Sequence, residues 1–161
     1  MKKLFNFITL FFLLLSAGVY SQLEGKVVKV KDGDTIVILD ENNKQHTIRV
    51  ADIDCPEKNQ PFGKKAKWFV SDQIYLKTVK IDVKSKDRYG RTIGLVLYQN
   101  KNLSGELLKV GLAWHYKKYS NNNYFSRLEK TAKQNKKGLW IDKNAVAPWN
   151  WRKYKKRKRY N

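Results

Sequence analysis

The chain has 161 residues and a formal net charge of +20 at pH 7, with 34 lysine and arginine residues against 14 acidic ones. Such an excess of positive charge favours polyanionic partners, because binding releases the counterions condensed on phosphates. Nucleic acid is the leading partner, and a merely soluble basic surface or one suited to an acidic cell envelope is the alternative. The single cysteine, Cys55, excludes an internal disulfide, so packing alone must stabilise the fold.

The N-terminus has the pattern of a secretory signal peptide. Two lysines follow Met1, residues 4–15 are almost wholly apolar, and small residues lead up to Ser21. An uncleaved membrane anchor is the alternative, but this apolar stretch is shorter than the roughly 18 residues that a span needs. We therefore expect residues 1–21 to be removed and the protein to be secreted, extracellular or periplasmic, without stable membrane association afterwards.

The remaining chain divides into a domain and a basic end. Residues 22–150 have the length of one domain that can bury a single core. Residues 151–161 are rich in lysine and arginine and contain no acidic residue. A run of this kind is usually a disordered tail, and we predict a basic C-terminal tail there.

The domain begins with three predicted strands. In residues 24–31, Val28 and Val30 alternate with lysines, which is the period of a half-buried strand. Asp32-Gly33-Asp34 then turns the chain into a β-branched strand over residues 36–39. A polar turn over residues 40–44 leads into a third strand that carries Arg49.

The polar turn allows the register of this hairpin to be estimated. If pairing is centred near Asn42, Asp34 lies opposite about Val50 and Arg49 lies opposite about Thr35. The first acidic cluster and the arginine are therefore expected at the same end of the hairpin.

A second acidic cluster, Asp54-Cys55-Pro56-Glu57, follows the third strand. Asp54 would lie about 13 Å beyond Arg49's end of the hairpin if the strand stayed straight. Pro56 restricts Cys55 to extended conformations, so we expect the bend that returns Asp54 to Asp34 within residues 52–54.

The rest of the domain predicts two more strands and three helices. The first helix begins at Pro61-Phe62-Gly63 and has Ala66, Phe69, Val70 and Ile74 on one face. The two strands span residues 78–84 and 92–98. A short helix is capped by Ser104 and ends at Gly111, and the last helix spans residues 121–137 and ends at Gly138. This order suits an α+β, mainly β fold. We predict a five-stranded antiparallel barrel with three packed helices, as in the oligonucleotide-binding (OB) fold.

The two acidic clusters suggest a metal site. A hard cation prefers oxygen ligands, and Asp34 and Asp54 supply two carboxylates that would repel each other without a cation or a proton between them. Each cluster alone is weak evidence, because Asp-Gly-Asp-Thr runs are common in turns.

Taken together with Arg49 and with the run Asp87-Arg88-Tyr89-Gly90-Arg91, the clusters resemble the staphylococcal nuclease (thermonuclease) family, over about residues 28–140. The segments Gly111-Leu112-Ala113-Trp114 and Gly138-Leu139-Trp140 also fit secreted bacterial members. The family's functional residues fall on five positions of this chain: Asp34 and Asp54 as calcium ligands, Arg49 and Arg91 as phosphate-binding arginines, and Glu57 as the catalytic glutamate.

The resemblance implies Ca²⁺-dependent cleavage of phosphodiesters in DNA and RNA that leaves 3′-phosphate ends. Arg49 and Arg91 offer planar forks that match phosphate oxygens and stabilise the charge that grows on phosphorus. The resemblance also implies that Glu57 acts as general base for an attacking water. The prototype has threonine where this chain has Cys55, and the family's metal ligand there is the backbone carbonyl, so Cys55 completes the predicted metal ligands. The segment 57–66 is also shorter than in the prototype.

An aromatic group is interleaved with lysines near the predicted site. Tyr89, Trp114, Tyr116 and Tyr119 can stack on bases without selecting sequence, and family members bind nucleotides with tyrosines in this region. The alternative is that Trp114 belongs to the core and the tyrosines are ordinary surface residues. His46 and His115 lie in no motif that needs an acid or a base.

The sequence as a whole predicts a secreted, Ca²⁺-dependent, sugar-nonspecific nuclease that acts on DNA and RNA as a monomer. A noncatalytic nucleic-acid-binding OB-fold protein is the alternative, and the complete set of acids and arginines argues against it. A basic protein that binds the cell envelope through its tail is a third possibility.

Overall fold

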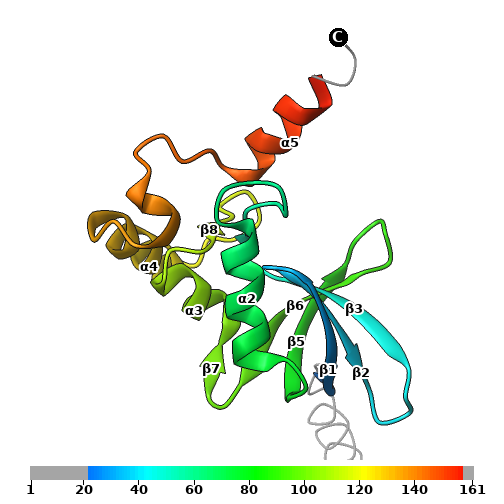
Figure 1. Cartoon of the computed structure of the whole chain (residues 1–161). Helices are drawn as coiled ribbons and strands as arrows, with labels where there is room; N and C mark the ends of the chain where they lie inside the picture. The colour runs from blue at the N-terminus through cyan, green and yellow to red at the C-terminus, as the bar shows by residue number, and fades with distance from the viewer. Residues whose placement is uncertain (1–21, 158–161) are drawn as a thin grey trace, which may run out of the picture.

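The computed structural model describes residues 22–157, and the expected signal peptide, residues 1–21, lies outside them. Figure 1 shows a β-barrel beside a group of helices. The barrel strands are β1 (Gln22–Asp32), β2 (Thr35–Leu39), β3 (Gln45–Val50), β5 (Thr78–Lys86) and β6 (Thr92–Tyr98). Three short strands are β4 (Ile53–Asp54), β7 (Lys101–Asn102) and β8 (Trp114–His115). The helices are α2 (Gly63–Ile74), α3 (Leu103–Lys109), α4 (Asn123–Gln134), the 3₁₀ helix η1 (Gly138–Ile141) and α5 (Pro148–Arg157).

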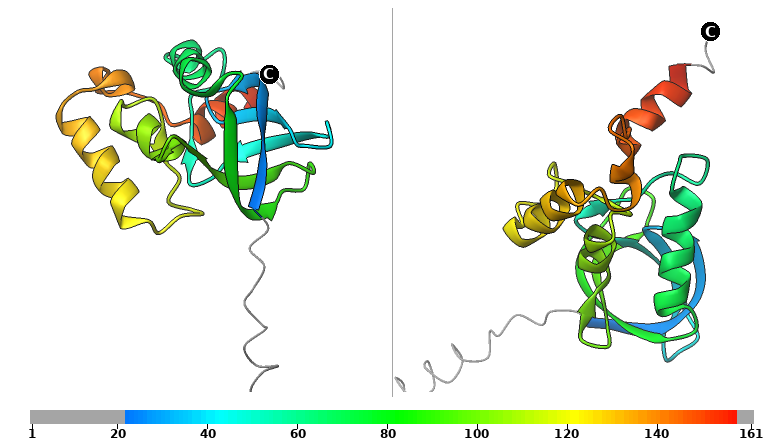
Figure 2. Two further views of the ribbon diagram at one scale, coloured as in Figure 1. Left: turned by 90° about the horizontal axis from the view of Figure 1, so that it is seen from below. Right: turned by 60° about the vertical axis from the view of Figure 1, so that its left-hand side comes forward.

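The five long strands form a closed barrel, as the sequence predicted. Their order is β3-β2-β1-β5-β6, and a pairing of β3 with β6 closes the ring, which is visible in the right-hand view of Figure 2. The neighbours along this order are antiparallel, whereas β3 and β6 are parallel, so the barrel is mixed. Closure pairs the edges of the sheet that would otherwise be open to other chains.

Strand β1 departs from simple alternation because it is bulged. Its register against β2 shifts between Val27 and Lys29 and again between Val30 and Asp32. The first bulge places Val27 and Val30 in the core, both at most 5 % exposed, while Val28 is only partly buried. The expectation that Val28 and Val30 share one face is therefore wrong, since an extra residue in a strand reverses the side-chain alternation beyond it.

Helix α2 covers the barrel along β1, as predicted from its apolar stripe. Ala66, Val70 and Ile74 are fully buried on its inner face. Burying a side chain of this size stabilises a fold by about 1.5–3 kcal/mol for valine or isoleucine. Phe69 is only partly buried and packs at the margin of the same core.

Helices α3 and α4 pack against each other on the neighbouring side of the barrel. Asn102, and not the predicted Ser104, caps α3, since its side chain accepts a hydrogen bond from the N–H of Gly105. Ser104 is buried and donates instead to the carbonyl oxygen of Ala51 at 2.8 Å. A serine in the first turn of a helix can thus serve tertiary packing when the preceding asparagine is the better cap.

A fourth helix, α5, replaces most of the expected tail. Pro148 stands at its first position, where proline is favoured because the missing N–H has no partner there anyway. Figure 1 shows α5 in red, extending away from the barrel near the C-terminus. The expectation of disorder is wrong for residues 151–157, which are helical. No helix among residues 22–157 is long and apolar enough to cross a membrane.

Candidate active site

The hairpin of β2 and β3 brings the first acid and the first arginine together. Thr35 pairs with Arg49, and the N–H of Val50 donates to the carbonyl oxygen of Asp34 at 2.8 Å, which confirms the predicted register. Nη1 of Arg49 lies 2.8 Å from Oδ2 of Asp34. The two side chains are 16 % and 9 % exposed, so water screens this ion pair only weakly.

A sharp bend returns Asp54 to the same place, where the sequence predicted it. Asp52 has φ 67°, the left-handed conformation, and its buried carboxylate pairs with Nζ of Lys84 at 2.7 Å. The N–H of Tyr116 donates to the carbonyl oxygen of Asp52 at 2.9 Å. Beyond the bend, β4 pairs with β8 and places Asp54 directly opposite Trp114.

Arg49 then bridges the two carboxylates. Its Nη2 lies 2.8 Å from Oδ1 of Asp54, whose side chain is only 1 % exposed. One guanidinium therefore serves two buried acids. Burial raises the pKa of Asp34 to about 7, Arg49 opposes that shift, and the neighbouring charges of Asp32 and Asp54 add to it.

Cys55 lies beside the first acid, with its main chain in contact with it. Its N–H donates to Oδ2 of Asp34 at 2.6 Å, and its side chain is 3 % exposed. Burial raises the pKa of the thiol well above its usual range, and the charge of Asp34 adds to the effect. A thiol held in its neutral form is a poor nucleophile, so the geometry gives the backbone of Cys55 the more direct connection to the site.

A compact loop after Pro56 presents Glu57. The N–H of Glu57 donates to Oε1 of Gln60 at 3.1 Å, and the N–H of Gln60 donates back to the carbonyl oxygen of Glu57 at 2.8 Å. A Cβ atom on Gly63 would overlap that same carbonyl oxygen, so only glycine allows α2 to start this close to the loop. The loop thereby fixes the backbone of Glu57, whose side chain remains 41 % exposed.

Arg91 is held at the end of a tight turn between β5 and β6. Its Nε lies 2.7 Å from Oδ2 of Asp87, and Oδ1 of Asp87 accepts hydrogen bonds from the N–H groups of Tyr89 and Arg91. Gly90 completes the turn with φ 77°. The carboxylate of Asp87 orients the arginine through Nε, on one edge of the guanidinium.

One cavity of about 580 Å³ gathers these groups. Among its lining residues are Asp34, Arg49, Asp54, Cys55, Glu57, Tyr89, Arg91, Tyr116, Tyr119 and Arg152. Nine of the ten residues predicted for the site therefore lie around a single space. The tenth, Trp114, is 7 % exposed and packs edge-on against Trp140 at 4.9 Å, outside this cavity.

The aromatic residues of the cavity connect to the C-terminal helix. Tyr116 meets Tyr119 edge-on at 4.9 Å and stacks flat on Trp149 of α5, with ring centroids 5.2 Å apart and planes within 3°. Tyr89 and Tyr119 remain mostly exposed, with Arg88 over the ring of Tyr89 and Lys118 over the ring of Tyr119. Trp149 thus extends the aromatic group of the cavity into α5, a helix that the sequence did not predict.

Arg152 is the site residue that the sequence did not predict. Its Nη2 lies 2.7 Å from Oδ2 of Asp54, and its Nη1 lies 2.6 Å from Oε1 of Glu57. Burial disfavours its charge, but hydrogen bonds to both carboxylates outweigh burial and raise the pKa of Arg152. The sequence signal for an ordered segment here was Pro148 followed by Trp149 and Trp151, because disordered segments are poor in aromatic residues.

The donors present fit a hard divalent cation. Asp34 and Asp54 both contact the guanidinium of Arg49, and Mg²⁺ or Ca²⁺ bound by these two carboxylates could complete its coordination with main-chain oxygens and water. Among residues 22–157, no group of three or more His, Cys, Asp and Glu side chains gathers in a way that could hold a metal ion, so a cation here would depend on two carboxylates and on ligands other than side chains. Any cation at Asp54 must share this carboxylate with Arg49 and Arg152.

Both histidines lie outside the cavity. The ring nitrogens of His115 lie 3.0 Å from Oγ of Ser126 and 2.9 Å from Oγ of Ser120, and its residue is 2 % exposed. Burial lowers the pKa of His115. His46 pairs with Asp40 at 2.7 Å, beside the hairpin turn at the other end of β3.

Comparison with known proteins gives this geometry its context. The model of the staphylococcal nuclease homologue family matches residues 47–142, which is more than half of the chain. An uncharacterized endonuclease of Haemophilus influenzae is 41 % identical over 155 residues, covering 96 % of this chain and 87 % of the relative. A micrococcal nuclease of Shigella flexneri is 36 % identical over 155 residues, covering 89 % of this chain and 88 % of the relative.

A plant protein extends the range of these relatives. The staphylococcal-like nuclease CAN1 of Arabidopsis thaliana is 38 % identical over 113 residues, which cover 70 % of this chain and 35 % of the relative. Nucleases of this family are generally metal-dependent, and the acids of the cavity match that requirement. The chain therefore belongs to the staphylococcal nuclease family and is a nuclease that hydrolyses phosphodiester bonds of nucleic acid.

Proposed function

We propose that the chain is an exported, Ca²⁺-dependent nuclease that cleaves both DNA and RNA and leaves 3′-phosphate ends. The observation that carries the proposal is the cavity in which Arg49 bridges Asp34 and Asp54 while Glu57 and Arg91 line the same space. Two buried acids bridged by Arg49 suit a divalent cation, which would share Asp54 with Arg152, and the large oxygen-binding Ca²⁺ tolerates an irregular set of ligands.

The substrate phosphate would lie between the two arginines. Arg49 and Arg91 present N–H groups in fixed planes that bind phosphate oxygens and stabilise negative charge as it develops. Both guanidiniums are already oriented, by Asp34 and Asp54 for Arg49 and by Asp87 for Arg91. When bound, the cation would supply further positive charge at the phosphate oxygens.

Glu57 would act on the attacking water. Its carboxylate is partly exposed, and Oε2 is free to accept a proton while Arg152 occupies Oε1. Arg91 is the candidate to stabilise the leaving 5′-oxygen, because it lines the cavity and contacts Asp87 through Nε, which leaves its Nη groups for the substrate. Cleavage of the bond to the 5′-oxygen leaves the phosphate on the 3′ side.

Lack of sugar and sequence preference would follow from stacking. Tyr89 and Tyr119 are 69 % and 67 % exposed and offer ring faces to any base. Because the predicted contacts are to phosphate and base faces, the 2′-hydroxyl would not decide binding. The site residues all come from one chain, which supports activity as a monomer.

The test is hydrolysis of plasmid DNA and of RNA by the purified mature protein, with Ca²⁺ and with a chelator. We expect cleavage of both substrates with Ca²⁺ only, and products whose 3′ ends are phosphorylated. Binding that persists with chelator but never leads to cleavage would fit a noncatalytic nucleic-acid-binding protein. N-terminal sequencing of the exported protein tests removal of residues 1–21.

A further inference from the structure

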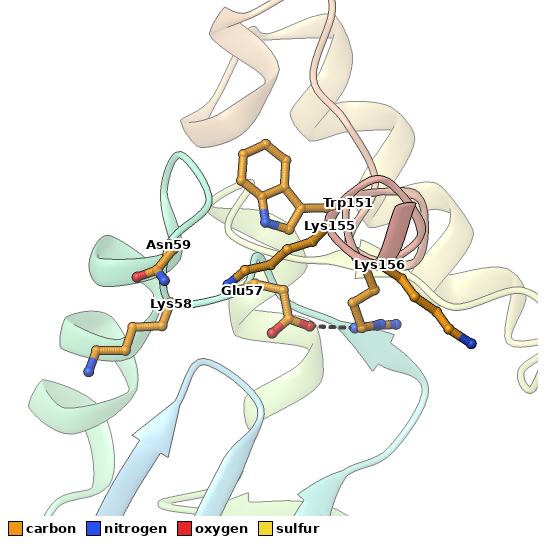
Figure 3. A pocket seen from close by; sticks show the side chains of 7 residues that line it. Glu57, Lys58, Asn59, Trp151, Lys155 and Lys156 are labelled. Atoms are coloured by element: carbon orange, nitrogen blue, oxygen red, sulfur yellow. Dashed lines mark hydrogen bonds and ion pairs between the residues drawn. The ribbon is translucent and has the colours of Figure 1, made fainter. Parts of the chain in front are cut away.

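A second groove opens beside the active site, between the Glu57 loop and α5. Its lining residues are Glu57, Lys58, Asn59, Trp151, Arg152, Lys155 and Lys156 (Figure 3). Its volume of about 420 Å³ falls in the range of about 300–1,000 Å³ that holds ligands of nucleotide size. Glu57 and Arg152 line both this groove and the active-site cavity, so the two spaces meet at that ion pair.

The groove is strongly positive. Lys58 lies on the loop, and Lys155 and Lys156 lie on α5, so positive side chains stand on both walls. All three are exposed, and none forms an ion pair with another described residue. The only acid in the lining is Glu57, which Arg152 already neutralises at 2.6 Å. Such a lining attracts consecutive phosphates.

One aromatic side chain also borders the groove. Trp151 is partly buried, and in Figure 3 its indole lies on the α5 side, across the space from Lys58 and Asn59. A tryptophan ring beside lysines is the arrangement that binds unpaired bases, whose faces are free in single strands and covered in a duplex. The lining therefore matches a single strand in both its phosphates and its bases.

We propose that this groove binds the single strand of DNA or RNA that continues from the scissile phosphate. Trp151 stacks on a base, and Lys58, Lys155 and Lys156 bind the phosphates beside it. The location of the strand rests on the proposed function, because a phosphate between Arg49 and Arg91 leaves the strand to run past Glu57 into the groove. Binding in the groove itself requires neither metal nor cleavage.

The experiment compares short and long single strands. Binding of a fluorescently labelled dithymidylate and octathymidylate is measured by anisotropy in chelator, with the full mature chain. Lys155→Ala/Lys156→Ala and Trp151→Ala should each weaken octamer binding by about tenfold and leave dimer binding within about twofold. Trp151→Phe, which keeps a ring, should recover most of the affinity.

Matched controls lie elsewhere on the surface. Lys77→Ala/Lys80→Ala removes the same charge beyond the opposite end of α2, at two exposed lysines. Trp68→Ala removes an indole from α2 that is 66 % exposed. Both controls should retain octamer affinity within about twofold, and the lysine pair of the groove should also reduce the salt dependence of octamer binding.

Several outcomes would contradict the proposal that this groove binds a single strand. Equal losses in Lys77→Ala/Lys80→Ala would show a general charge effect, and equal losses for dimer and octamer would place these residues in the active site. Circular dichroism confirms that α5 stays helical in each variant, and Trp151→Phe remains a test if Trp151→Ala does not fold. Cleavage of plasmid with Ca²⁺ separates the two proposals. If the protein cleaves plasmid normally but the substitutions do not change octamer binding, the nuclease proposal stands and the groove proposal is wrong.

Discussion

Nη2 of Arg152 lies 2.7 Å from Oδ2 of Asp54, so a residue of the last helix occupies a carboxylate at the centre of the active site. Residue 152 reaches this position from the far end of the sequence, and its other Nη atom contacts Glu57. The positive charge of the guanidinium stands on the same acid that is proposed to bind the metal. Metal binding and the position of α5 should therefore be coupled.

Replacing Arg152 tests that coupling. In Arg152→Ala only Arg49 still competes with the metal for Asp54, and we expect the affinity for Ca²⁺ to rise by about tenfold, since charges this close repel even when partly solvated. Isothermal titration with Ca²⁺ and no substrate measures the change. Arg157→Ala, on the same helix, removes an equal charge without an ion pair and is the control. Unchanged Ca²⁺ affinity in Arg152→Ala would mean that the contact imposes no cost on the metal.

Arg91→Lys should lower kcat by orders of magnitude, because a lysine ammonium cannot reproduce a fork that is oriented at Nε by Asp87. Plasmid cleavage under saturating Ca²⁺ measures the effect. Arg88→Lys is the control in the same turn, since Arg88 also lines the cavity but bonds to the hydroxyl of Tyr89 and is not oriented by a carboxylate of residues 22–157. Equal activity of the two variants would remove Arg91 from the phosphate site.

Glu57→Gln should keep the fold while slowing cleavage by about 10²–10⁴-fold, the usual contribution of a positioned base. The amide is the same size as the carboxylate but cannot take the proton of the attacking water. Ca²⁺ affinity and thermal unfolding should change little. Glu41→Gln, an exposed residue of the hairpin turn, is the control. A Glu57→Gln variant that cleaves at the normal rate would refute the assignment.

Gly63→Ala should destabilise the protein and reduce activity together. The added methyl group would overlap the carbonyl oxygen of Glu57, and relieving that overlap should cost about 1–3 kcal/mol and displace the loop. Gly105→Ala is the matched control, because its methyl group meets only Phe125 and Leu128 at 3.6 and 3.7 Å inside α3. That control should be neutral or stabilising, since alanine favours a helix over glycine. Urea unfolding and plasmid cleavage give the two readouts.

Stability should fall in mild acid because of His115. Burial lowers its pKa in the folded protein below the ordinary value of 6.5, so the unfolded chain binds the proton more readily as pH falls below about 6.5. The free energy of unfolding therefore declines through that window until the folded pKa is passed. His115→Asn should show a shallower decline in urea unfolding at a series of pH values. Identical slopes in the wild-type protein and His115→Asn would contradict the assignment.

The hairpin and its site were predictable because their information is local. The polar turn over residues 40–44 sets the pairing of Thr35 with Arg49, and Pro56 demands a bend near Asp52, which the structure places there with φ 67°. Apolar spacing likewise predicted α2 and the barrel strands. In each case, residues that are close in the sequence both form the pattern and determine the local structure that it predicts.

The remainder depends on contacts between distant residues. The bulges of β1 exchange Val28 for Val27 in the core, and only pairing with β2 reveals them. The parallel closure of β3 on β6 joins strands that are separated in the chain by β4, α2 and β5. Arg152 contacts Asp54 across 98 positions of sequence, and a run of lysines and arginines gives no indication of which one turns inward. Composition therefore identified residues 151–161 as basic but did not predict that residues 151–157 form a helix.

The buried thiol of Cys55 offers a way to time the opening of this enzyme. Gly33 packs so closely on Cys55 that a methyl group there would collide with its Cβ and Sγ atoms, and the N–H of Cys55 bonds to Asp34. An alkylating reagent reaches the sulfur only when these neighbours separate. The rate of alkylation, measured by mass spectrometry, thus reports how often the structure around the catalytic acids opens. Ligands that bind in the site should lower this rate.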